Sequence, residues 1–272
     1  MNEIEAYLSQ LNNKINKDIG IKIMEQKNHA ASEGDESRAN YLWCLYQVFL
    51  VQKNYTDAFW NMKNKKYEEA WLQLDRADIE LSFLEEHYDK YFGGPIGLRF
   101  QLMYILNAIK RLQTLFPYKL FLSRESIIKR EKCSICGETI KLRGGCGHKL
   151  GQLYNGEQCC HEVTEFELIG MALVKDPFDK YTYLKIEGQD YNYQIIDFLM
   201  EHLQTPYELW GVEKVKIKAP NYTNIGSNNL CSCGSGKKYK KCCRGTNNEM
   251  MDHFIFDFPQ NDGINIEISS IS

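Results

Sequence analysis

Nine of the ten cysteines in this 272-residue sequence fall in two clusters, one within residues 133–161 and the other within residues 231–243. Clustered thiols form disulfides, act as redox pairs or bind metal ions. The N-terminus does not read as an export signal, so we expect a reducing compartment, where such clusters bind metals more often than they pair. The isolated Cys44 lies in the apolar run "YLWCLYQVFL" and is interpreted as a small core residue.

The second cluster reads "CSCGSGKKYKKCC". It is not a phosphate loop, because that loop needs a glycine where Cys231 stands and a serine or threonine where Lys238 stands. Its cysteines also lack the Cys-x-x-Cys spacing of a redox dithiol. Two close pairs of thiols joined by a glycine-containing turn do suit the tetrahedral coordination of zinc. The neighbouring cations would favour the thiolate form, which binds the metal.

This stretch resembles the SEC-C zinc motif, which is named for the C-terminal tail of the SecA translocation ATPase and occurs in many bacterial proteins. The match is nearly complete and departs at Ser232, where proline is common. The resemblance implies four zinc ligands: Cys231, Cys233, Cys242 and Cys243. In its family the module docks onto a partner, a chaperone or the ribosome in the best-known case.

The basic loop of the motif is therefore a candidate contact surface, made of Lys237, Lys238, Tyr239, Lys240 and Lys241. An alternative is that the lysines only balance the charge of the thiolates and keep the tail soluble. The sequence leaves both interpretations open.

The first cluster offers more ligands than one zinc ion takes: Cys133, Cys136, Cys146, His148, Cys159, Cys160 and His161. Its Cys133-x2-Cys136 pair is a standard zinc knuckle. For the other two positions we prefer His148 and Cys159, with Cys146 as the strongest competitor. The segment is similar to a zinc-binding segment of uncharacterised bacterial and phage proteins. We expect two zinc ions per chain, and the surplus of ligands favours structural zinc over catalytic zinc.

No catalytic residue is predicted. The stretch "HEVTE" lacks the second histidine of a zinc-protease helix, because Glu165 stands in its place. We also find no serine nucleophile motif and no marked pair of carboxylates. A zinc-dependent hydrolase therefore remains only a second alternative, and no small-molecule substrate is indicated.

The elements that must position these clusters form an α+β protein with an all-α N-terminal part. Apolar periodicity predicts a helix carrying Ile4 to Ile15, one over 36–52, a short one capped by Thr56, one over 66–87 and one ending before Pro117. The pair of helices at 57–80 resembles one tetratricopeptide repeat. Lys65 stands where that family has its turn glycine, and no second copy follows, so we interpret the pair as an ordinary helical hairpin.

Beyond Pro117 the sequence changes to β-forming runs. We predict strands at 166–174, 180–186 and 212–218, a helix at 191–203, and a terminal hairpin of 253–258 with 264–268. The expected organisation is a helical domain (1–117), a mixed α/β domain (118–218) with its zinc knuckle at 133–161, a linker (219–230), the zinc motif (231–244) and a strand-rich tail (245–272).

The net charge of −3 gives no overall attraction to nucleic acid, and no run approaches 18 apolar residues, so we expect a cytoplasmic protein that does not enter the membrane. The preferred function is that of a bacterial or phage-encoded protein-binding adaptor with zinc as its scaffold. The alternative is nucleic-acid binding through "SRESIIKREK" and the lysine-rich loop, with Tyr154 or Tyr239 available for stacking.

Overall fold

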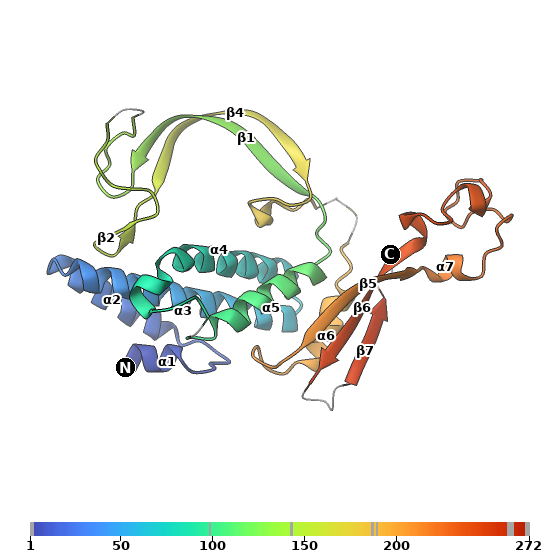
Figure 1. The fold of residues 1–272 in the computed structure, drawn as a ribbon, viewed down its shortest axis with the longest axis horizontal. Helices are drawn as coiled ribbons and strands as arrows, with labels where there is room; N and C mark the ends of the chain where they lie inside the picture. Colours follow the sequence, from blue (N-terminus) through green and yellow to red (C-terminus); the bar gives the residue numbers. More distant parts are fainter. Residues whose placement is uncertain are drawn as a thin grey trace. The chain divides into compact units, whose positions relative to one another are not determined.

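A computed structural model describes residues 3–97, 99–141, 144–185, 188, 190–259 and 264–269. The chain divides into two compact units, Met1–Glu201 with Thr205–Tyr207, and His202–Gln204 with Glu208–Ser272. The fold is α+β, as predicted (Figure 1). Within the described ranges, no helix has the length and apolar character that a bilayer crossing requires.

Helices open the first unit: α1 (Glu3–Leu8), α2 (Lys17–Ser32), α3 (Glu36–Lys63), α4 (Tyr67–Phe92) and α5 (Leu102–Leu115). The predicted helix carrying Ile4 to Ile15 is wrong beyond Leu8, where α1 ends. The predicted break before Thr56 is wrong, because α3 runs through it and buries Thr56. Gln52 and Asn54, which precede Thr56 on α3, are buried too. Gln52 donates hydrogen bonds to the carbonyl oxygens of Leu8 and Phe100, at 2.8 and 3.0 Å, so a mid-helix polar side chain finds partners in other segments.

Helices α3 and α4 form the predicted helical hairpin. In its turn, Lys65 adopts the backbone conformation that the glycine of the repeat family would adopt. Lys65 has a φ of 59°, the left-handed conformation that glycine adopts most readily. The two helices span 28 and 26 residues, well beyond the roughly 34-residue length of a whole tetratricopeptide repeat. The hairpin therefore differs from such a repeat in its dimensions.

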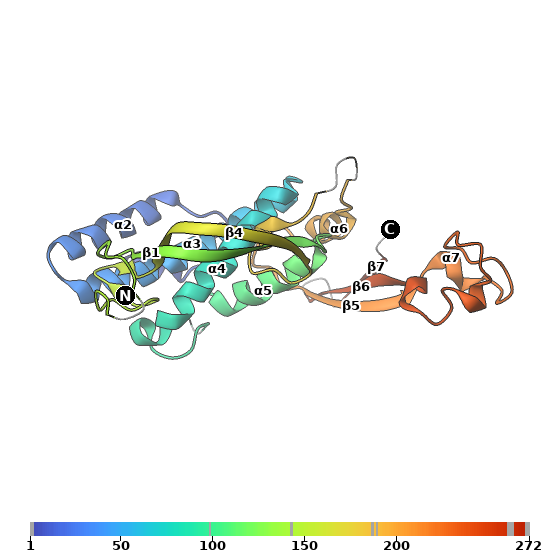
Figure 2. The ribbon, with the colours of Figure 1, turned by 90° about the horizontal axis from the view of Figure 1, so that it is seen from above.

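A long antiparallel hairpin follows the helices. Its strands are β1 (Phe121–Cys133) and β4 (His161–Val174), which run along the helices near α4 (Figures 1 and 2). The polar segment "SRESIIKREK" lies inside β1, whereas its composition did not suggest a strand. The strand predicted at 180–186 is wrong, because Lys180–Thr182 form a short 3-10 helix.

Aromatic packing fixes the end of this hairpin at which β1 begins. Phe121 is buried, and its ring lies 6.2 Å from that of Trp71 on α4. Trp71 also packs on Phe116 and Tyr118, and its indole N–H donates to the carbonyl oxygen of Lys180 at 2.7 Å. One buried tryptophan thus joins the helices to the start of β1.

The other end is held by polar side chains that three helices contribute. Two short strands, β2 (Leu153–Tyr154) and β3 (Glu157–Gln158), form a turn against α2, α3 and α4. The side chains contact the backbone of this turn as follows: Lys27 Nζ to Gly156 O at 3.0 Å, Asn40 Oδ1 to Gly156 N at 2.6 Å, Asn40 Nδ2 to Leu153 O at 3.5 Å and His87 Nε2 to Gly151 O at 2.9 Å.

The turn itself demands glycine at one position. Gly156 has a φ of +82°, and a Cβ placed there would meet Lys27 and Ala39 at 3.1–3.3 Å. Only glycine therefore lets this turn approach the helices so closely.

The rest of the chain agrees with the predicted elements. Helix α6 (Gln194–His202) matches the predicted helix at 191–203. The sheet of the second unit has the order β5 (Gly211–Lys218), β6 (Met250–Phe258) and β7 (Ile264–Ser269), all antiparallel, which confirms the three predicted strands. Residues 260–263 of the terminal hairpin and 270–272 of the tail lie outside the described residues. Between β5 and β6 stand α7 (Pro220–Thr223) and the short 3-10 helices Tyr239–Lys241 and Asn247–Glu249.

The polar contacts to the β2–β3 turn generate a stability prediction. Asn40→Ala removes the acceptor of the buried Gly156 N–H, and an unsatisfied buried donor costs about 1–3 kcal/mol. We therefore expect the free energy of unfolding to fall by that amount in urea titrations followed by circular dichroism.

A matched control is Asn28→Ala on α2, where the asparagine is exposed. Its free energy of unfolding should stay within about 0.5 kcal/mol of the wild type. Equal unfolding midpoints for the two variants would contradict the role given to Asn40.

Candidate metal centres

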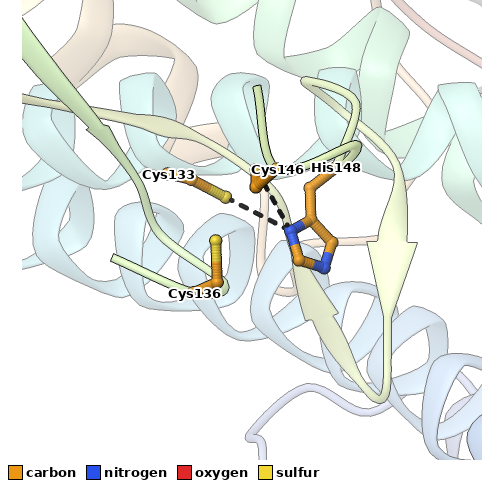
Figure 3. A group of neighbouring side chains, drawn as sticks. All are labelled: Cys133, Cys136, Cys146 and His148. Carbon is orange, nitrogen blue, oxygen red and sulfur yellow. Dashed lines mark hydrogen bonds between the residues drawn. The ribbon is translucent and has the colours of Figure 1, made fainter. Parts of the chain in front are cut away.

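The first cysteine cluster brings four candidate ligand atoms together. They belong to Cys133, Cys136, Cys146 and His148 and all lie within 4.8 Å of one another (Figure 3). Cys133 is the last residue of β1, and the turn to Cys136 is closed by a hydrogen bond from Gly137 N to Cys133 O at 2.8 Å. Cys146 and His148 approach from the loop that follows, where Gly147 has a φ of +86°.

The distances suit a tetrahedral zinc ion. His148 Nδ1 lies 3.3 Å from Cys146 Sγ and 3.7 Å from Cys133 Sγ. In a tetrahedron with bonds of about 2.3 Å to sulfur and 2.0 Å to nitrogen, a sulfur and a nitrogen lie about 3.5 Å apart. The four side chains can therefore surround one ion with little movement.

Cys159 lies beside this group and outside it. Its Sγ is 3.9 Å from Cys133 Sγ, and the side chain is buried. Burial and the hydrogen bond with Cys133 raise the pKa of the Cys159 thiol to about 11, which favours a neutral thiol. The geometry thus favours Cys146 over Cys159 for the fourth ligand, contrary to our preference from the sequence. The ligand assignment itself remains a prediction.

The thiol of Cys133 has a lowered pKa. Burial raises its pKa, but hydrogen bonds from the backbone N–H groups of Cys136 and Ile135 outweigh this effect and lower the pKa to about 6. A thiolate at Cys133 gives the metal a first anchor near neutral pH, because the thiolate is the form that binds.

The two remaining candidates do not point into the group. Cys160 is exposed, and its backbone N–H donates to Ser134 Oγ at 2.9 Å. His161 Nδ1 lies 3.6 Å from a carboxylate oxygen of Glu131. Both therefore contact residues next to the candidate ligands.

The second cluster forms a group of its own. Cys231, Cys233, Cys242 and Cys243 place their sulfurs within 4.8 Å of one another. The Cys242 sulfur lies 3.5 Å from that of Cys233 and 3.8 Å from that of Cys243. Neighbouring sulfurs in a zinc tetrathiolate lie about 3.8 Å apart, so this group also fits zinc.

Ser235 has a role that its place in the motif does not reveal. Its Oγ lies 3.2 Å from Cys242 Sγ, and its hydroxyl and backbone N–H lower the pKa of Cys233 to about 6. The serine between the two glycines thus helps to stabilise a thiolate in this group.

The module around these cysteines has a very small core. Tyr222, Cys231, Tyr239 and Cys243 are buried together, and the Tyr222 and Tyr239 rings stack at 5.8 Å. Tyr222 was missed from the sequence because it lies in the segment we expected to be a linker. Since four buried residues make a poor core, metal coordination would supply most of the module's stability.

Tyr239 is not part of a contact surface, which corrects our prediction. It is 2% exposed, its hydroxyl donates to Glu249, and Lys218 Nζ lies 5.3 Å from the centre of its ring. The ring is therefore unavailable for stacking on a base. The other members of the predicted surface, Lys237, Lys238, Lys240 and Lys241, are exposed.

Both groups offer four protein ligands. A tetrahedral ion held by four protein side chains keeps no position for water or substrate, so both arrangements suit structural metal sites better than catalytic ones.

Comparison with known proteins identifies the motif that contains the second cysteine group. The SEC-C motif model matches residues 228–245, so the chain carries this motif. The protein translocase subunit SecA of Clostridium botulinum is 54% identical over 39 residues, which are 14% of this chain and 4% of SecA. A UPF0225 protein of Geobacter sulfurreducens is 76% identical over 21 residues, which are 8% of this chain and 13% of that protein. The chain therefore spans a small part of each of these relatives. No solved structure matches it significantly.

The two groups predict how metal content responds to mutation. We expect two zinc ions per chain by mass spectrometric elemental analysis, and one ion in Cys231→Ser or Cys133→Ser, because each variant removes a ligand from one group only.

A matched pair tests the fourth ligand of the first group. Cys146→Ser should lose one zinc ion, whereas Cys159→Ser should keep both. Loss of metal in Cys159→Ser with retention in Cys146→Ser would show that our assignment is reversed.

Proposed function

We propose that this protein is a zinc-binding adaptor whose C-terminal module docks onto an acidic surface of a partner protein. The proposal rests on the exposure of the module's lysines and on their lack of ion pairs within the described residues. Lys237, Lys238, Lys240 and Lys241 are exposed, and no ion pair is formed by any of them within the described residues. Residues 228–245 contain no aspartate or glutamate.

Several cations on the strands outside the module are paired within the chain. On β1, Lys129 pairs with Glu167 at 2.9 Å and Arg130 with Glu165 at 3.5 Å. On β5, Lys214 and Lys216 both pair with Asp252. Charge that is paired within the chain contributes little to attracting a partner, whereas unpaired cations on one small module steer an acidic surface toward it.

Zinc has a structural role in this proposal. A tetrathiolate zinc site carries a net charge of about −2, so the five cations of residues 228–245 exceed what charge balance requires. This excess supports docking over the alternative in which the lysines only neutralise the thiolates. Free thiols that serve as metal ligands also fit a reducing compartment, so we infer a cytoplasmic protein.

Nucleic-acid binding has less support. The basic segment of β1 is ion-paired with β4, and the buried Tyr239 offers no stacking platform. The test below therefore distinguishes a protein partner from nucleic acid.

The test is a charge reversal in the module. Lys237→Glu combined with Lys240→Glu should reduce the recovery of protein partners in affinity purification from the native host by at least about tenfold, because like charges would face each other across the interface. The variant should still bind two zinc ions, which elemental analysis would check.

The control reverses two lysines outside the module. Lys110 and Lys119 are exposed, and Lys110→Glu with Lys119→Glu changes the net charge equally. This variant should recover the same partners as the wild type. Equal loss in both variants, or capture that nuclease treatment abolishes, would refute docking by the module onto protein.

A further inference from the structure

The second half of β4 exposes a continuous apolar run. Residues 168–174 read "LIGMALV" and carry no charge. The side chains of Leu168, Ile169, Met171 and Leu173 are 53–66% exposed. Leu168 pairs with Ser126 and Gly170 with Glu125, so Ile169 forms a bulge within the run. Successive residues elsewhere in the run point to opposite faces, so the run presents apolar side chains on both faces of the hairpin.

Such a run is typical of a strand that is buried on both faces. The first half of β4 is different, because Glu162, Glu165 and Glu167 interrupt it. A sheet of two strands is also marginal in water, and three or more strands are needed for independent stability. The exposed half of β4 therefore has the composition of a central strand in a larger sheet.

The two edges of the hairpin are not equivalent. The outer edge of β1 is covered near both ends, by the bridges of Phe121 with Tyr183 and of Lys132 with Thr139. Its middle carries Lys129 and Arg130, and charged side chains discourage further strand pairing. Along β4, the described residues provide no strand on the side away from β1. The free edge that can accept a strand is thus the edge of β4.

The charge pattern of β4 is complementary to itself in one arrangement. If two copies pair their β4 strands antiparallel about a two-fold axis at Met171, the apolar run 168–174 lies opposite the same run of the other copy. Glu167, which also pairs with Lys129 of its own β1, then lies opposite Lys175 of the other copy, the residue that follows the end of β4, twice by symmetry. Opposite charges directly across a strand pair are stabilising, and no two glutamates face each other.

We propose that this protein self-associates through the outer edge of β4, which joins the two hairpins into a four-stranded antiparallel sheet around a two-fold axis. Main-chain hydrogen bonds hold the strands together, and the apolar side chains of the two runs contact one another across the new strand pair on each face. The occupant of this edge is a second copy of the chain. This inference is independent of the docking role of the C-terminal module.

The experiment is sedimentation of the full-length, zinc-loaded chain over a range of concentrations. We expect a dimer for the wild type and a dissociation constant at least about tenfold higher for Met171→Lys, because two lysines would meet at the axis. Met171 is 66% exposed, so the substitution leaves the folded monomer intact, which circular dichroism would check.

Two further variants test the register. Val163→Lys makes the same kind of change on the same strand, at a residue 46% exposed, but outside the paired run, so its dissociation constant should match that of the wild type. Lys175→Glu should weaken the dimer, and adding Glu167→Lys to it should restore the affinity.

Hydrogen exchange supplies a second readout. The amides of residues 168–174 should exchange more slowly as the protein concentration rises. A wild-type chain that stays monomeric to about 100 μM, where an interface of micromolar affinity is mostly occupied, overturns the proposal and leaves the edge to a different protein. A dimer that Met171→Lys does not weaken also overturns it.

Discussion

The cysteine-rich segments lack the hydrophobic core that orders the helices, and this constraint shapes the rest of the structure. Apolar residues are buried throughout α3, α4 and α5, whereas the core of the C-terminal module consists of two tyrosines and two cysteines. A segment of that size cannot offset its conformational entropy by apolar burial alone. A metal ion coordinated by four side chains would supply the missing cross-links, which fits the concentration of cysteines in both segments.

The first metal centre is connected to the helices by hydrogen bonds to backbone atoms. Lys27, Asn40 and His87 come from three helices and contact the β2–β3 turn, which lies next to the candidate ligands in the chain. A metal ion held by the candidate ligands would fix, from one side, the same short segment that these contacts fix from the other. Together with the packing of Phe121 on Trp71, they hold the β1–β4 hairpin at both ends and leave its middle exposed. The proposed strand pairing uses the exposed run 168–174, which lies in the second half of β4 toward the Phe121 end.

Short-range sequence patterns predicted the features of the structure that depend on neighbouring residues alone. Ligand spacing located both cysteine groups, and apolar periodicity located most helices and the strands of the second unit. The errors share a physical cause. The β1 segment was not recognised as a strand because its charges are balanced across the hairpin by glutamates more than 30 residues away. The predicted helix break before Thr56 was wrong because a buried polar side chain there, Gln52, finds its hydrogen-bond partners in distant segments.

The choice among surplus ligands could not be made from spacing, because it depends on which loop approaches Cys133. The burial of Tyr239 likewise depends on Tyr222 and Glu249, which lie outside the cysteine motif. The sequence alone thus determined the kind of chemistry, since thiols at close spacing need only short-range geometry to bind a metal. The tertiary structure decided which side chains complete each group and which face solvent, because those properties arise from contacts between segments far apart in the chain.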